Sequence, residues 1–187
     1  MWNLLFFIFR IYEEFFPLLR SLQSSGVFTI RNLVADSIIS ITPRVFHSDL
    51  IRHIDSILWN QQSLCNDIHS CYLLCYKLLK DIDSENALLL LDIFCAKEKI
   101  KLNTDYMRQS VLIDILVKLV QLLHGSIKAL DLLFHHTNLS FSELSCTNKL
   151  TVGKPYLEKS LARAIIVLLE YAKGKNIFSR FKRYRSI

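Results

Sequence analysis

The residues best suited to metal chemistry lie in one short stretch, where Cys65, His69, Cys71 and Cys75 follow one another at helical spacings. A zinc site needs about four ligands that converge on one point. Cys65 and His69 are one helical turn apart, and so are Cys71 and Cys75. At about 100° per residue, however, the second pair points ~240° away from the first. We therefore expect no metal site here and interpret Cys71 and Cys75 as small core residues.

Other catalytic signals are weak. The adjacent His135 and His136 lack nearby cysteines and are interpreted as a helix C-terminal cap that interacts with the helix dipole. No Gly-x-Ser-x-Gly elbow occurs, and the 4 glycines are too scattered to form a phosphate- or cofactor-binding turn. Spacing alone leaves a nucleophile–histidine–acid set open, because such triads assemble in space. We expect no cofactor and no catalysis by this chain alone.

Residues 173–187 carry the whole net charge of +6, because the 23 cations and 17 acids of the chain leave 17 cations against 17 acids in residues 1–172. Phe178, Phe181 and Tyr184 recur among these cations at i, i+3 and i+6, so a helical turn here would have a basic and an aromatic face. Candidate partners are RNA phosphate, an acidic protein face or anionic lipid. The alternative is a solvated segment that aids solubility. The cations are Lys173, Lys175, Arg180, Lys182, Arg183 and Arg185.

The apolar start of the chain, residues 1–9, matches neither a signal peptide nor a membrane span. No basic segment precedes it, no small-residue cleavage site follows it, and Arg10, Glu13 and Glu14 interrupt it well short of ~20 apolar residues. We expect a core helix, with a membrane-surface helix as the alternative. Because no polar residues precede this apolar helix, we expect the chain to be part of a longer protein. The 5 cysteines, odd in number and irregularly spaced, favour reduced thiols in the cytosol or nucleus, and we expect a cytoplasmic protein.

The composition and periodicity predict an all-α fold. With 4 Gly and 3 Pro, the chain has too few turn formers for an all-β sandwich or barrel. Breaks at Ser24–Gly26, Thr42–Pro43 and Asn103–Asp105 separate apolar stretches of helical period. The stretch Asn103–Asp105 is expected to cap the helix that follows it, and Asp81–Ser84 is expected to cap residues 85–99. The predicted helices are 2–23, with a kink or restart at Pro17, then 28–41, 47–60, 64–80, 85–99, 106–135 and 155–173.

Four local expectations follow from the pattern. In 28–41 the buried face should include Ile30, Leu33, Val34 and Ile38. The long helix 106–135 should be hinged at His124–Gly125, and the polar stretch 137–153 should be an exposed loop. The last helix should begin with Pro155 and stop at Gly174.

Short connections predict antiparallel hairpins stacked as in HEAT or armadillo repeats, over a single domain of residues 1–172 followed by the basic tail 173–187. Two segments share one pattern, in which an arginine follows an apolar residue and precedes further apolar residues by three or four positions. The arginines are Arg31 and Arg108. Such an arginine packs its stem at the edge of a buried stripe, so both are interpreted as repeat-stacking residues. The result would be a right-handed α-solenoid fragment.

Four motifs over residues 15–123 together resemble the C-terminal part of the THADA family, the thyroid adenoma-associated protein and its fungal counterparts. The order and spacing of the motifs carry the resemblance. A departure is Ser70, where the family usually has Gly. The motifs are Phe16-Pro17-Leu18-Leu19, Ile30-Arg31-Asn32-Leu33-Val34-Ala35-Asp36-Ser37-Ile38-Ile39, Asn66-Asp67-Ile68-His69-Ser70 leading into Tyr72-Leu73-Leu74, and Met107-Arg108-Gln109-Ser110-Val111-Leu112-Ile113-Asp114-Ile115-Leu116.

The resemblance implies a non-catalytic scaffold that directs a tRNA ribose 2′-O-methyltransferase to the anticodon loop. The partners would be that enzyme and, directly or through it, tRNA. Asn66 and His69, neighbours at i and i+3, become candidate contacts for the partner or RNA, or else a polar clamp between repeats. The alternative function is a stand-alone module that binds nucleic acid or a membrane surface through the basic tail.

Overall fold

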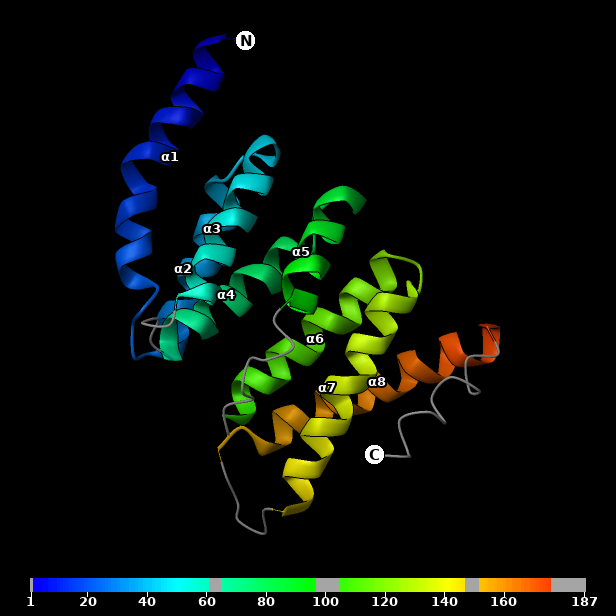
Figure 1. Ribbon diagram of the computed structural model, residues 1–187. Coiled ribbons are helices and arrows are strands. Elements are labelled where there is room, and N and C mark those ends of the chain that lie inside the picture. Colours follow the sequence, from blue (N-terminus) through cyan, green and yellow to red (C-terminus); the bar gives the residue numbers. More distant parts are fainter. Residues whose placement is uncertain (1, 61–64, 97–104, 147–151, 176–187) are drawn as a thin grey trace. The chain divides into compact units, whose positions relative to one another are not determined.

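The computed structural model describes residues 2–60, 65–96, 105–146 and 152–175, and all its regular structure in these ranges is helical (Figure 1). This confirms the predicted all-α class. No helix in these ranges is long and apolar enough to cross a membrane. The elements are α1 (Trp2–Leu22), α2 (Phe28–Ile41), the short 3-10 helix η1 (Arg44–Phe46), α3 (His47–Trp59), α4 (Cys65–Leu78), α5 (Ser84–Ala96), α6 (Tyr106–Leu122), α7 (Ile127–Cys146) and α8 (Lys154–Lys175).

The contacts group the chain into two compact units, unit 1 (Met1–Lys97) and unit 2 (Glu98–Ile187). The prediction of one domain over residues 1–172 does not anticipate this subdivision. The basic tail begins inside α8, and its residues 176–187 lie outside the described part of the chain.

In unit 1 the helices pack on hairpin neighbours and also on alternate helices along the chain. α1 contacts α2 and α3 contacts α4, while α2 also packs on α4 and α3 on α5. The apolar side chains between them are fully buried, and an ion pair of 2.7 Å between Lys77 Nζ and Asp36 Oδ1 joins α4 to α2 at the edge. The core includes Ile38, Leu50, Ile51, Ile54, Cys71, Leu74, Cys75, Leu78, Leu90 and Leu91.

Unit 2 is a bundle in which α6, α7 and α8 all contact one another. Leu116, Leu133 and Leu161 contribute to its core, with exposed fractions of 1% or less. Arg163 Nη1 donates to both carboxylate oxygens of Asp114 at 2.8 Å, which ties α8 to α6. The charged pair lies at the margin of the apolar core, where its heads keep contact with water.

The predicted helix 106–135 is wrong, because it is two helices. His124 and Gly125 adopt φ values of 48° and 69°, a left-handed backbone that ends α6 before α7 begins at Ile127. Glycine is needed at position 125, because a Cβ there would overlap the ring of Tyr171 on α8. The sequence pattern therefore located the break at the correct residues, but predicted a hinge within one helix where the structure has the end of one helix and the start of another.

The predicted loop over 137–153 is also wrong through residue 146, where α7 continues; residues 147–151 are outside the described part. Several hydroxyl side chains in this stretch are satisfied within the helix, because they donate to carbonyls four residues earlier. Thr137 Oγ1 donates to the Leu133 carbonyl at 2.7 Å, and Ser145 Oγ to that of Phe141 at 2.9 Å. Hydroxyls satisfied in this way can be buried, and Thr137 is only 4% exposed.

Smaller differences concern single residues. α1 runs through Pro17 without a restart, and α8 passes Gly174 to end at Lys175. In α2 the predicted inward positions Ile30 and Leu33 are 38% and 59% exposed. The buried stripe is instead formed by Arg31, Val34, Ala35 and Ile38, because that side of the helix faces α4 and α1.

Candidate interaction site

The N-terminal half of α4 holds the loop between α1 and α2 through a set of polar side chains. Ser70 Oγ donates to the carbonyl of Gln23, and Asn66 Nδ2 donates to the carbonyl of Ser24 at 3.3 Å. The hydroxyl of Ser24 in turn donates to the carboxylate of Asp67. A loop that would otherwise leave carbonyls unsatisfied is thus fixed to a helix more than 40 residues away in the sequence.

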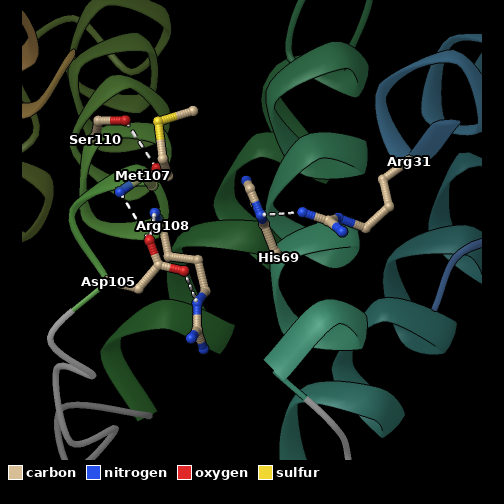
Figure 2. A network of polar contacts seen from close by, with 6 residues as sticks. All are labelled: Arg31, His69, Asp105, Met107, Arg108 and Ser110. Atoms are coloured by element: carbon tan, nitrogen blue, oxygen red, sulfur yellow. Dashed lines mark hydrogen bonds and ion pairs between the residues drawn. The ribbon is translucent and has the colours of Figure 1, made fainter. Parts of the chain in front are cut away.

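A buried pair of side chains, Arg31 from α2 and His69 from α4, lies beside this loop. The two are 6% and 3% exposed, and their facing nitrogens, Arg31 Nη2 and His69 Nδ1, are 3.2 Å apart (Figure 2). Arg31 Nη1 also donates to the carbonyl of Ser25, and the ring of Phe28 lies 5.6 Å from that of His69. An arginine has only donors, so Nδ1 must accept and His69 must be neutral in this arrangement.

These contacts define a loop clamp, consisting of Arg31, Asn66, Asp67, His69 and Ser70, which joins α4 to α2 and to the loop before α2. The two predicted site residues, Asn66 and His69, both belong to it. Their side chains serve packing between the first hairpin and α4, which fits the clamp interpretation. A role for either in contacting a partner or RNA stays a prediction.

Arg108, the second predicted stacking residue, has a different local role in unit 2. Asp105, the last residue of the predicted cap Asn103–Asp105, caps α6 by accepting from the backbone N–H groups of Met107 at 2.9 Å and Arg108 at 3.4 Å. Arg108 Nε then donates to the other carboxylate oxygen at 2.9 Å, as Figure 2 shows. Ser110 Oγ donates to the Met107 carbonyl at 2.8 Å in the same turn.

Electrostatics around this cap favour the charged carboxylate. Burial alone would raise the pKa of Asp105, but the hydrogen bond and positive charge of Arg108, together with the two backbone N–H groups, lower it below the usual range. The Arg108 side chain is 11% exposed, so its charge is partly shielded from water. Among the contacts described, Arg108 stabilises the start of its own helix, whereas Arg31 joins separate segments.

The predicted basic site is only partly within the described residues. Lys173 is exposed near the end of α8, and Lys175 is the last residue of that helix. Arg180, Lys182, Arg183 and Arg185 lie outside the described part of the chain. Binding of an anion by these six cations stays a prediction.

Sequence reasoning missed a buried histidine. His135 and His136 do not cap a helix end, because both lie inside α7. His136 is 6% exposed, and its burial, with a smaller contribution from His135, lowers its pKa to about 4. Among the described residues its Nδ1 has no hydrogen-bond partner. The apolar spacing could have identified it, because Leu133, His136 and Ser140 share one helical face.

The candidate metal ligands point to different surroundings. Cys65 is exposed, His69 faces Arg31, and Cys71 and Cys75 are buried in the core as predicted. Within the described ranges, no three His, Cys, Asp or Glu side chains cluster in a way that could hold a metal ion.

The chain matches no family model, no curated protein and no solved structure.

Proposed function

We propose that this chain is a non-catalytic scaffold, built from stacked helical hairpins in the manner of HEAT or armadillo repeats. The observation that carries the proposal is the packing in unit 1, where α2 packs on α4 and α3 on α5 in addition to the hairpin contacts. Packing between alternate helices is typical of helical repeats. The loop clamp supports the same interpretation, because its buried polar groups are used to hold one hairpin on the next helix.

An exposed apolar stripe on α1 is suited to binding a protein partner. Phe15, Leu18 and Leu22 recur at i, i+3 and i+7, so they lie on one helical face, and they are 43–60% exposed. Contiguous apolar surface of this kind commonly marks a protein interaction site. A scaffold would use such a stripe to bind its partner.

The proposed partner is a tRNA ribose 2′-O-methyltransferase, for which the chain would act as a cytoplasmic auxiliary subunit directing methylation of the anticodon loop. The support for this is the ordered set of THADA-like motifs, two of which supply Arg31, Asn66 and His69 to the loop clamp. The methyl donor and the catalytic residues would belong to the enzyme.

The test combines purified chain, the methyltransferase, tRNA and S-adenosylmethionine. We expect no methyl transfer by the chain alone and increased anticodon-loop methylation when enzyme and chain are combined. Leu18→Lys should weaken binding and stimulation, because it places a charge in the α1 stripe. The control is Leu88→Lys on α5, where the leucine is 49% exposed but lies outside that stripe.

Each outcome bears on a different part of the proposal. Turnover by the chain alone would contradict the non-catalytic role. Absence of stimulation would reject this enzyme as the partner. Equal effects of the two lysine variants would show that the α1 stripe is not the binding surface.

A second candidate function is nucleic-acid binding through the basic tail, favoured by the six cations without an acid in residues 173–187. Phosphate contacts would make the affinity for tRNA fall steeply with salt concentration. Replacing the six cations with glutamine should abolish both the affinity and the salt dependence. If tRNA affinity is unchanged, this candidate is rejected; co-sedimentation of the unaltered chain with anionic vesicles would instead favour the membrane-surface alternative.

A further inference from the structure

A groove between α7 and α8 in unit 2 offers an apolar site with a volume of about 210 Å³. For comparison, a cavity of ~150 Å³ is enough to hold a benzene molecule. Two of the lining side chains, Phe141 and Leu169, are 41% and 45% exposed, so the groove presents apolar surface to solvent. The lining consists of Phe134, Thr137, Asn138, Phe141, Ile165, Leu168, Leu169 and Ala172. The groove therefore has the size and the surface to bind one aromatic ring.

We propose that this groove binds the aromatic side chains of the chain's own residues 176–187, with Phe178 as the first ring to enter. Ala172, in the wall of the groove, belongs to the last turn of α8, which ends at Lys175. Phe178 follows Lys175 by three residues, and an extended chain covers ~3.3–3.6 Å per residue, or about 10 Å here. The segment can therefore turn back onto the groove without any further linker.

The composition of the segment also fits this site. Ile177, Phe178, Phe181 and Tyr184 stand among cations, and burying such rings in an apolar groove is favourable. Asp131, which is half-buried, lies one helical turn before Phe134, the first residue of α7 in the lining of the groove. It would attract the positive charges that accompany the rings.

Photo-crosslinking in the full chain tests the contact directly. The photoreactive residue p-benzoylphenylalanine replaces Phe178 in one variant and Ser179 in a matched control. A mixture of isotopically light and heavy chains separates crosslinks within one chain from those between two. We expect position 178 to crosslink within its own chain to residues 134–141 and 165–172, and position 179 to give few such products.

Hydrogen exchange of the double variant Phe178→Ala, Phe181→Ala provides an independent measurement. Loss of a buried ring should speed exchange of the amides in 134–141 and 165–172 about tenfold, while those of unit 1 keep their rates. Ser179→Ala should change neither set. Crosslinks scattered over the surface, crosslinks only to a second copy, or unchanged exchange in the double variant would each overturn the proposal. None of these outcomes depends on the identity of the protein partner.

Discussion

The buried imidazole of His136 predicts that unit 2 loses stability when the pH falls below neutrality. The pKa of His136 is lowered from 6.5 to about 4, because burial in α7 disfavours the charged ring. The unfolded chain, in which the ring titrates near 6.5, therefore takes up the proton more readily than the folded chain. The contribution of the His136 ring to the free energy of unfolding is fully present above pH 6.5, and it is lost as the pH falls from 6.5 towards 4.

The magnitude follows from the two pKa values. At pH 5 the unfolded ring is almost fully protonated and the folded ring almost fully neutral, which corresponds to a loss of about 2 kcal/mol relative to pH 7.5. The loss would approach about 3 kcal/mol below pH 4. Compared with a typical domain stability of about 5–15 kcal/mol, this is a measurable fraction.

The assay compares three full-length chains at pH 7.5 and pH 5 by hydrogen exchange of the slowest amides in α6, α7 and α8, which report opening of unit 2. His136→Leu should remove about 2 kcal/mol of the pH dependence, because leucine does not titrate. His135→Gln is the matched control, since His135 is the exposed neighbour, and should retain most of it. The reasoning is refuted if His136→Leu keeps the full pH dependence, or if NMR shows the His136 ring titrating near 6.5.

Three further substitutions test the packing. Arg31→Ala should destabilise unit 1 by about 2–4 kcal/mol, because it removes a buried donor from His69 and the Ser25 carbonyl; urea unfolding followed by circular dichroism measures this, and a change below 0.5 kcal/mol would contradict the clamp. Asp105→Ala should destabilise unit 2 by about 1–2 kcal/mol, because it removes the cap of α6. Amide hydrogen exchange in the first turn of α6 should become faster, and unchanged exchange there would contradict the cap. Gly125→Ala should lower the melting temperature because of its positive φ and the Tyr171 ring, whereas Gly26→Ala should not, because a Cβ added there meets no atom within 4 Å; equal effects would contradict the turn geometry.

The sequence allowed the helices of unit 1 to be predicted closely, because their boundaries depend on local signals. The break at Ser24–Gly26 separates α1 from α2, and α2 begins and ends at the predicted residues, Phe28 and Ile41. Such signals act within one or two turns of the chain, so they can be recognised without tertiary contacts.

The incorrect sequence predictions concern features that tertiary contacts determine, namely which face of a helix is buried and how far a helix extends. Ile30 and Leu33 have the correct period for a buried face, but the position of α4 buries the stripe with Arg31 instead. The polar residues after His136 suggested a loop, yet α7 continues through them, and Thr137 and Ser140 on its inner face are buried.

The candidate site was only partly predictable for the same reason. Helical spacing placed Asn66 and His69 on one face, but their acceptors and donors lie about 40 residues earlier, in the loop before α2 and in α2 itself. Contacts over such separations leave no periodic trace in a single sequence. The apolar groove between α7 and α8 likewise depends on how two helices meet, which the pattern of neither helix contains.

The placement of the thiols in α4 gives this protein an intrinsic chemical reporter. Cys71 and Cys75 are 0% exposed, whereas Cys65 on the same helix is exposed. Alkylating reagents need access to the thiolate, so the inner pair should react only when unit 1 opens, while Cys65 reacts from the native state. The alkylation rate of the inner pair relative to that of Cys65 would report the fraction of molecules in which unit 1 is open, without any introduced label.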